Sequence, residues 1–248
     1  MDLKGMGAIV TGGAQGIGEA TAVRLAQLGA KVAVLDMNLA GAEAVAARIK
    51  GEGFEAMSVQ ADVTRSDQVE AAIDQVCRQF GSVDILVNNA GWTQTHPFMT
   101  EDEAYWDKVI AINLKGPILM CKAALKCMSE KNFGKIVNVA SDAARIGNAG
   151  EVVYSAAKGA VVTLTKSLAR EVARYGVNVN CVCPGPTNTP LMKDQPEKVI
   201  EALKRMMPFR RIAEPLEVAN VIAFLCSREA GFVTGQILSA SGGLTMVG

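Results

Sequence analysis

The sequence predicts an α/β fold in which helices cover both faces of one parallel sheet. Three observations lead to this prediction. Short apolar segments alternate with longer amphipathic segments from end to end, as strands joined by helical crossovers do. A glycine-rich loop, Gly12–Gly18, follows the first apolar segment. Clusters of small and polar residues follow the other apolar segments, and in a parallel sheet these positions share one edge.

Each apolar segment is expected to be a strand of this doubly wound sheet. The seven strands are expected at Gly7–Thr11, Lys31–Leu35, Phe54–Gln60, Val83–Val87, Gly134–Ala140, Val177–Cys183 and Gln236–Ser239. The helices are expected at Ile17–Leu28, Leu39–Lys50, Ser66–Phe80, Glu101–Met128, Val152–Tyr175 and Glu214–Ser227. Pro117 lies inside one of these helices, so a kink or break is expected at Gly116–Pro117. The 248 residues are predicted to form one domain with a mobile substrate loop at about 188–212.

Composition excludes several kinds of partner. Lys+Arg and Asp+Glu number 25 each, so no basic field exists to attract nucleic acid or an anionic membrane. No apolar run is long enough to span a bilayer and no signal segment is recognisable, so we expect a cytoplasmic protein. The six cysteines form no C-x-x-C pair and His96 is the single histidine, so we expect reduced thiols and no metal site.

The segment Ser141–Lys158 carries a hydroxyl, a phenol and an amine. Tyr154 and Lys158 are four residues apart and share one face if the segment is helical. A neighbouring cation favours phenolate, so the pKa of Tyr154 is expected to fall below about 10. Such a phenol can take a proton from an alcohol, and Ser141 could donate a hydrogen bond to the same oxygen. The alternative is an amphipathic helix that carries Tyr and Lys by chance.

The glycine loop predicts a dinucleotide site. Glycines let the backbone approach a pyrophosphate, and the following helix offers unpaired N–H groups. Asp36 ends the second strand about 20 residues beyond the loop, where a carboxylate accepts ribose hydroxyls and repels a 2′-phosphate. The sequence therefore favours NAD over NADP, unless Asp36 is only a surface aspartate. The expected cofactor residues of the loop are Gly12, Gln15, Gly16, Ile17 and Gly18.

Later loops add further candidates for cofactor contacts. Asp62 could accept from an adenine amino group and Val63 could pack on the ring, although Asp62 could simply start a loop. Small residues after the fourth strand would let the chain pass close to a cofactor, and the loop after the sixth could close over a nicotinamide. These residues are Asn89, Ala90 and Gly91 in the first case, and Pro184, Gly185, Thr187 and Thr189 in the second.

Taken together, these motifs resemble the short-chain dehydrogenase/reductases, which have the Rossmann fold. The family's motifs stand here as T-G-x-x-x-G-x-G at Thr11–Gly18, N-N-A-G at Asn88–Gly91, Asn113, Ser141, the Tyr154–Lys158 pair and P-G at Pro184–Gly185. The resemblance implies that Tyr154 is the acid/base, that Lys158 binds the nicotinamide ribose, and that Ser141 polarises the substrate oxygen. It also implies that Asn113 holds a water, whereas the residues alone leave a structural asparagine equally open.

Several segments resemble one subgroup of the family more closely. N-N-A-G-W, S-D-A-A-R-I-G and V-C-P-G-P-T-N-T resemble enzymes that oxidise 2-hydroxycyclohexanecarboxyl-CoA or 2-(hydroxy(phenyl)methyl)succinyl-CoA in anaerobic aromatic degradation. The resemblance implies NAD-dependent oxidation of a bulky 3-hydroxyacyl-CoA by a homotetramer, or by a chain paired with a related subunit. The alternatives are a 3-oxoacyl-carrier-protein reductase and a non-catalytic nucleotide-binding subunit.

Three residues are candidates for substrate contacts. Arg145 lies four residues beyond Ser141 and could hold a substrate carboxylate bidentately, or pair with a nearby acid, Asp142 or Glu151. Trp92 could wall an aromatic or alicyclic ring, or be a packed loop residue. Met192 could adapt to an apolar ligand or belong to the core.

Overall fold

The computed structural model describes residues 1–193 and 197–246. Their strands form one parallel sheet of seven strands in the order β3-β2-β1-β4-β5-β6-β7. The strands are β1 (Gly7–Thr11), β2 (Lys31–Asp36), β3 (Ala56–Gln60), β4 (Ile85–Asn88), β5 (Gly134–Val139), β6 (Val177–Pro184) and β7 (Ile237–Ala240). The predicted strands are confirmed, with ends that differ by one or two residues.

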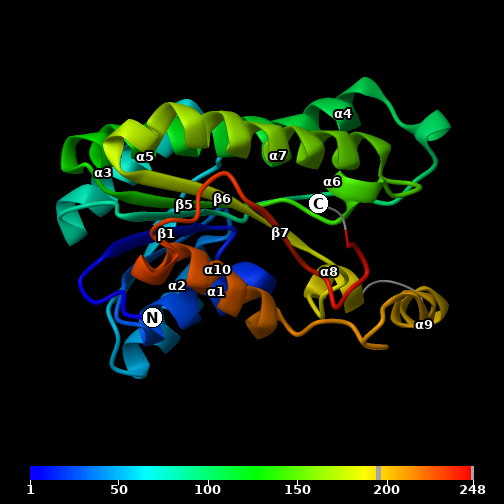
Figure 1. The fold of residues 1–248 in the computed structure, drawn as a ribbon, viewed down its shortest axis with the longest axis horizontal. Helices are drawn as coiled ribbons and strands as arrows, with labels where there is room; N and C mark the ends of the chain where they lie inside the picture. Colours follow the sequence, from blue (N-terminus) through cyan, green and yellow to red (C-terminus); the bar gives the residue numbers. More distant parts are fainter. Residues whose placement is uncertain (194–196, 247–248) are drawn as a thin grey trace.

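Helices cover both faces of this sheet, as Figure 1 shows. One layer holds α1 (Gly16–Gln27), α2 (Leu39–Gly51) and α10 (Pro215–Cys226), and the other holds α3 (Ser66–Phe80), α5 (Gly116–Lys131) and α7 (Val152–Val172). Successive strand residues point to opposite faces, so Val10 enters the core beneath the first layer and Ile9 the core beneath the second. Every residue of β1 is buried because helices cover both faces of the sheet. The predicted doubly wound fold is confirmed.

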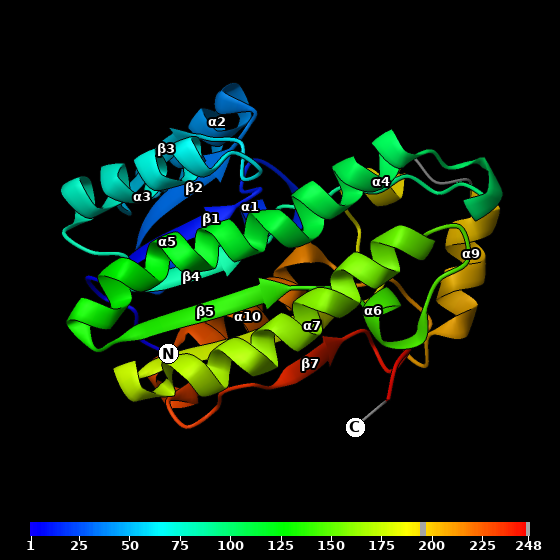
Figure 2. The ribbon, with the colours of Figure 1, turned by 90° about the horizontal axis from the view of Figure 1, so that it is seen from above.

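Short elements gather beyond the carboxyl ends of the strands (Figure 2). They are α4 (Glu103–Ile110), α6 (Ala143–Ile146), α8 (Pro190–Lys193) and α9 (Glu197–Met206). The helix α9 has no buried residue, and its Val199 and Met206 are 40% and 63% exposed. The expected substrate loop at 188–212 includes these last two helices, and its residues 194–196 lie outside the described part of the chain. Short 3₁₀ segments are Phe98–Thr100, Ala173–Tyr175 and Arg228–Ala230.

The helix does not break at Gly116–Pro117, and a kink there stays a prediction. The chain passes from α4 into a π-helical segment, η2 (Ala111–Lys115), and then directly into α5, where Pro117 occupies the first turn. A proline in that position has no N–H to donate to the carbonyl of Asn113, four residues earlier. The helix widens at that place instead of ending, and π-helical turns of this kind are frequent at functional sites. The sequence pattern located the irregularity but not its form.

Candidate active site

Two loops at the carboxyl edge of the sheet are joined by the side chains of Thr11 and Asn89. The Thr11 hydroxyl accepts hydrogen bonds from the backbone N–H groups of Asn89 and Ala90, each at 3.0 Å. The Asn89 amide donates to the carbonyls of Thr11 at 3.0 Å and Gly12 at 3.1 Å. The glycine loop and the N-N-A-G loop therefore form one rigid unit. Thr11 was not among the expected site residues, although a hydroxyl at the end of an apolar strand was the signal for it.

The glycines of the loop are required by close backbone contacts. A Cβ on Gly18 would lie 2.0 Å from the Gly12 carbonyl oxygen, and one on Gly12 would lie 2.9 Å from the Ala90 Cα. Gly12 also has a positive φ of 63°. Gln15 precedes α1 as its N-cap and forms no side-chain capping bond, so the first N–H groups of the helix keep their capacity for an anion. The loop fits the pyrophosphate of a dinucleotide.

Asp36 lies where β2 ends, directly against the glycine loop. Its carboxylate accepts from the N–H of Ala14 at 3.1 Å and from the N–H of Asn38 at 3.0 Å. These bonds hold the negative charge at the position that the sequence predicts for an adenosine ribose. A 2′-phosphate brought to this edge would meet a fixed carboxylate.

Asp62 and Val63 follow β3 and make contacts within the protein. Asp62 accepts from the N–H and hydroxyl of Thr64 at 2.8 and 2.7 Å, which is the loop-starting role left open by the sequence. Val63 is buried, and a Cβ on Gly116 would lie 2.8 Å from its Cγ2 atom. A hollow of about 540 Å³ lies beside Asp62 and is bordered by Met37. Contact of these residues with an adenine ring stays a prediction.

The residues Ser141, Tyr154 and Lys158 come together between β5 and α7. The Lys158 ammonium donates to the Val139 carbonyl at 2.9 Å, and the Ser141 hydroxyl lies close enough to Tyr154 to lower the pKa of its phenol. The Lys158 nitrogen lies 5.8 Å from the centre of the Tyr154 ring. The helical spacing thus places the phenol and the amine on one face, next to the hydroxyl at the end of β5.

Burial controls the protonation of this pair, and the expected fall in the pKa of Tyr154 is wrong for the protein by itself. Burial, together with the nearby carboxylate of Glu151, raises the pKa of Tyr154 above its ordinary value, while the Ser141 hydrogen bond opposes this increase. Burial also lowers the pKa of Lys158 from 10.5 to about 8. The reason is that both groups lose water, whereas the ammonium is directed to a backbone carbonyl rather than to the phenol oxygen.

Asn113 is fully buried in the π-helical segment, and its amide is satisfied within the protein. Its oxygen accepts from the Trp92 N–H at 3.2 Å, and its nitrogen donates to the carbonyls of Trp92 at 2.7 Å and Val109 at 2.9 Å. A Cβ on Gly91 would lie 3.0 Å from the Asn113 oxygen and 3.3 Å from the Lys158 nitrogen. The structure therefore brings Asn113, Gly91 and Lys158 together, and the amide fixes the loop at Trp92.

The Trp92 ring packs within the protein. The Lys108 ammonium lies 3.7 Å from its ring centre, and the Tyr105 ring centre is 5.6 Å away at an angle of 59°. These contacts fit the second of the two roles that the sequence allows for Trp92, that of a loop residue packed within the protein. A role for Trp92 as a wall of the substrate site stays a prediction.

Arg145 lies on α6 and extends towards β7. Its guanidinium donates to the Ile237 carbonyl at 3.2 Å and to the Ser239 hydroxyl at 3.1 Å. The Ser239 hydroxyl in turn donates to the buried carboxylate of Asp142 at 2.7 Å. Arg145 is thus connected to Asp142 through Ser239, and the set joins α6 to the last strand. These contacts favour a structural role for Arg145.

The loop after β6 touches the glycine loop. A Cβ on Gly16 would lie 3.2 Å from the Thr189 methyl group, so the two loops are in contact. Within the loop, the Thr187 hydroxyl donates to the Gly185 carbonyl at 2.9 Å, and the N–H of Met192 donates to the Thr189 carbonyl at 3.0 Å. Met192 is half-buried within α8. The expected closing loop therefore lies over the start of α1.

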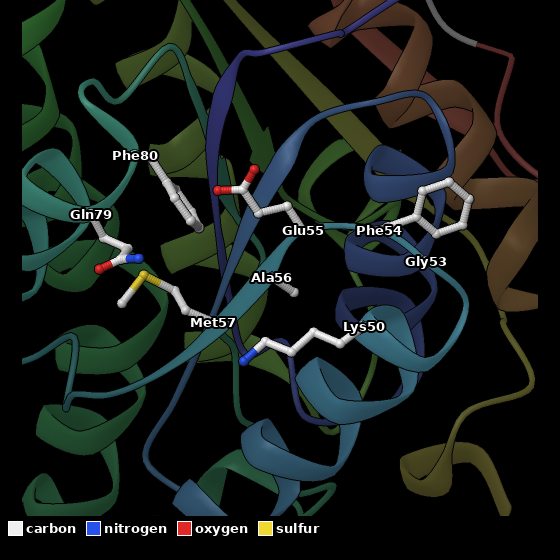
Figure 3. Close-up of a pocket in the computed structure, with 8 residues that line it drawn as sticks. All are labelled: Lys50, Gly53, Phe54, Glu55, Ala56, Met57, Gln79 and Phe80. Carbon is white, nitrogen blue, oxygen red and sulfur yellow. The ribbon is translucent and has the colours of Figure 1, made fainter.

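Away from this edge, the structure offers little that resembles a site. Figure 3 shows a hollow of about 420 Å³ at the opposite end of β3, where the side chains of Lys50, Glu55, Met57 and Phe80 do not converge on a common point. No group of three or more metal-ligating side chains occurs in the described residues. The described helices also include none that is long and apolar enough to cross a membrane. The candidate active site is therefore the carboxyl edge of the sheet.

A parallel sheet whose glycine loop lies at the same edge as a serine, a tyrosine and a lysine is typical of a nucleotide-dependent oxidoreductase. A family model described as enoyl-(acyl carrier protein) reductase matches residues 12–245. The chain belongs to the short-chain dehydrogenase/reductase family and is an oxidoreductase of the EC 1.1.1 type.

Three relatives match this chain over nearly its whole length. It is 38% identical to the (2S)-[(R)-hydroxy(phenyl)methyl]succinyl-CoA dehydrogenase subunit BbsD of Thauera aromatica, over 99% of each chain. It is 44% identical to the cis-4-hydroxycyclohexanecarboxylate dehydrogenase of Sinomonas cyclohexanicum, over 97% of this chain and 96% of the relative. It is 40% identical to the 3-oxoacyl-[acyl-carrier-protein] reductase FabG of Staphylococcus aureus strain Mu50, over 96% and 98%.

Proposed function

We propose that this protein is an NAD-dependent dehydrogenase that oxidises a bulky, alicyclic or aromatic 3-hydroxyacyl-CoA to the 3-oxoacyl-CoA. The observation that carries the proposal is the juxtaposition of Ser141, Tyr154 and Lys158 with the Gly91 loop. A hydroxyl, a phenol and an amine at one strand end are the groups needed to remove a proton from a secondary alcohol.

The residues at the carboxyl edge fit NAD. The cradle at Gly12 and Gly18 has no room for a Cβ, and the N-terminus of α1 follows it, so these residues would hold the pyrophosphate. Asp36 would hold the adenosine ribose and disfavour a 2′-phosphate. We assign the nicotinamide end to Lys158 and to the loop from Pro184 to Thr189. NAD, when bound, supplies the acceptor for the substrate hydride.

We assign the proton transfer to Tyr154. Its phenol is neutral in the protein by itself, so loss of its proton needs support from its surroundings. The Ser141 hydrogen bond lowers the pKa of Tyr154, and a protonated Lys158 adds positive charge nearby. Ser141 would hold the substrate oxygen, while Tyr154 takes its proton. Lys158, with a pKa of about 8, can pass this proton onward near neutrality, on the side where Asn113 lies.

The names of two relatives support a bulky, ring-bearing alcohol. One acts on a hydroxy(phenyl)methyl succinyl-CoA and the other on a hydroxycyclohexanecarboxylate, so both substrates carry a hydroxyl group and a six-membered ring. The test is to mix the purified protein with NAD and to follow NADH formation with each candidate separately. The candidates are 2-hydroxycyclohexanecarboxyl-CoA, 2-(hydroxy(phenyl)methyl)succinyl-CoA and free cis-4-hydroxycyclohexanecarboxylate.

Each result of this assay has a distinct meaning. Turnover of either thioester supports the proposal and fixes the acyl group. Turnover of the free acid alone would remove the CoA ester from the proposal but keep the ring-bearing alcohol. Absence of turnover with all three, in a protein that binds NAD, would contradict the proposed substrate class.

A 3-oxoacyl-carrier-protein reductase is the second candidate, because a relative of that name is 40% identical over 243 residues. The carboxylate of Asp36 disfavours the 2′-phosphate of NADPH, which such reductases normally prefer. Competition between NADH and NADPH in the reduction of a 3-oxoacyl thioester would separate the two functions. A strong preference for NADPH and for the carrier-protein substrate would favour this second candidate.

A non-catalytic subunit is a candidate of another class, since one relative is named as a subunit. We propose instead a cytoplasmic enzyme that is active as a homotetramer. Ile118 on α5 and Leu238 on β7 are 41% and 43% exposed, which supports an interface on these elements. Light scattering of the purified chain should give the mass of four copies, and an assay of this form should show full activity. An inactive chain that regains activity only with a related protein would establish the subunit function.

A further inference from the structure

A pair of cysteines lies between α3 and α5, outside the candidate active site. The sulfur atoms of Cys77 and Cys127 are 3.0 Å apart, and both cysteines are free and partly exposed. Figure 2 shows α3 and α5 side by side on one face of the sheet. Fifty residues separate the two thiols in the sequence, so the fold alone brings them together.

The distance between the two sulfur atoms distinguishes between metal binding and disulfide formation by this pair. Two thiolates on one tetrahedral zinc ion lie roughly 3.8 Å apart, since each Zn–S bond is about 2.3 Å. A disulfide bond is about 2.05 Å. The observed 3.0 Å is too short for a shared zinc ion and about 1 Å from a covalent bond. No third metal-ligating side chain joins the pair among the described residues.

We propose that Cys77 and Cys127 form a dithiol site that closes to an intramolecular disulfide when the protein meets a low-molecular-weight disulfide. The thiolate of one cysteine attacks a sulfur of the reagent, forms a mixed disulfide and releases one thiolate. The second cysteine thiolate then attacks the protein sulfur of that mixed disulfide and releases the second thiolate. The protein loses two electrons and two protons, and the reagent is reduced to two thiols.

The surroundings of the pair set the pH dependence of closure. Burial, the Cys127 sulfur and the carboxylate of Asp74 raise the pKa of Cys77. Because Cys77 must react as a thiolate in one of the two steps, closure should become faster as the pH rises.

The disulfide would connect helices that also meet near the predicted adenosine site. The ion pair between Glu70 and Lys126, at 3.5 Å, already joins α3 to α5. The loop ahead of α3 carries Val63, which packs against Gly116 at the start of α5. Closure at Cys77 and Cys127 would hold these two helices together along their length, without a contact to Tyr154 or Lys158.

The test is to incubate the purified protein with oxidised glutathione and to count thiols after denaturation. The count should fall from six to four, peptide mapping should show Cys77 joined to Cys127, and dithiothreitol should restore six. The Cys77→Ser variant should stop at a glutathionyl group on Cys127. The Cys127→Ser variant should likewise stop at a glutathionyl group on Cys77, whereas Cys226→Ala, a matched control at a buried thiol, should still close the bond.

Two outcomes would overturn the proposal. In the first, Cys77 and Cys127 of the wild-type protein each carry a glutathionyl group with no cross-link between them. In the second, six thiols remain at alkaline pH, where closure should be fastest. The thiol count and the mass are measured without substrate turnover. The disulfide proposal and the proposed dehydrogenase function can therefore fail independently of each other.

Discussion

Removal of water determines the charge states of Tyr154 and Lys158. The phenol keeps its proton above its ordinary range, and the ammonium loses its proton more readily than a free lysine. Burial is the largest cause of both pKa shifts, so the charged form of each group costs free energy that an exposed group would not lose. Near neutrality Lys158 is therefore the member of the pair that can change its charge state readily, whereas Tyr154 is held neutral until a bound partner stabilises the phenolate.

The role of the phenol can be tested with Tyr154→Phe, which removes only the hydroxyl. We expect NAD binding to be retained and kcat to fall by about 10²–10⁴-fold, because general acid–base catalysis contributes that much. Stopped-flow or steady-state NADH formation measures kcat, and calorimetric titration with NAD measures binding. A variant with near-normal turnover would show that another group removes the proton.

The cost of the buried ammonium can be tested with Lys158→Met. The side chain is 3% exposed and its pKa falls from 10.5 to about 8, so the folded state holds the proton less tightly than the unfolded state. The penalty is therefore complete below pH 8, decreases as the pH rises from 8 to 10.5, and is absent above that range. We expect Lys158→Met to raise the free energy of unfolding at pH 7 by about 3 kcal/mol while abolishing turnover.

Urea unfolding at pH 7 and at pH 10 measures this difference between the two proteins. The stabilisation by Lys158→Met should be large at pH 7 and small at pH 10. A variant that is less stable than the wild type at pH 7 would show that the bond to the Val139 carbonyl outweighs the cost of burying the charge.

Substitution of Arg145 can distinguish a structural role from a role in substrate binding. If it holds a substrate carboxylate, Arg145→Ala should raise KM mainly for the succinyl-CoA substrate, which carries a free carboxylate. If its bonds to Ile237 and Ser239 are its function, the variant should affect thermal stability and all substrates alike. Measurement of KM for both thioesters, together with Tm, distinguishes these outcomes, and the contacts with β7 favour the second.

Along the seam between β5 and α7, three polar contacts fix the position of the helix. Ser141 meets Tyr154, the Val139 carbonyl meets Lys158, and Asn138 donates to the buried hydroxyl of Thr165 at 2.9 Å. The amide of Asn138 also accepts from Asn88 at 2.8 Å, so the seam continues into β4. A slip of one helical residue moves the helix by about 1.5 Å, enough to separate every pair.

The contact farthest from the chemistry gives a test of this positioning. Thr165→Val keeps the shape but leaves the Asn138 amide without its acceptor, so we expect a loss of about 1–3 kcal/mol in stability and a lower kcat. The KM for NAD should change little, and Thr165→Ser should restore kcat because it restores the hydroxyl. Thr163→Val, an exposed position on the same helix, is the matched control. A normal kcat in the Thr165→Val variant would contradict the positioning role.

Patterns that depend on neighbours in sequence predicted most of this site. The glycine spacing, the strand ends and the four-residue step from Tyr154 to Lys158 each follow from local geometry. The solvent exclusion that shifts both pKa values arises from residues distant in sequence, so it could not be read from the segment. The packing of Trp92 under Lys108 and the direction of Arg145 towards β7 also depend on tertiary contacts.

In the whole molecule, the two helical layers make the sheet the rigid part and leave the chemistry to its carboxyl edge. The disulfide proposed at Cys77 and Cys127 would act on one of these layers. Closing a loop of fifty residues stabilises a protein by roughly 4 kcal/mol in the chain-entropy description. Oxidation should therefore raise the Tm of the wild-type protein, and it should not raise that of Cys77→Ser.

The exposed helix α9 also affects the response of the whole chain to a protease. A segment with no buried residue can open locally at a small fraction of the global unfolding free energy. Trypsin should therefore cut first after Lys198, Lys204 or Arg205, and a limited digest analysed by mass spectrometry would show it. Earlier cleavage within α1 or α7 would contradict this order. Because both cores lie outside α9, the nicked protein should keep its sheet and its far-ultraviolet circular dichroism.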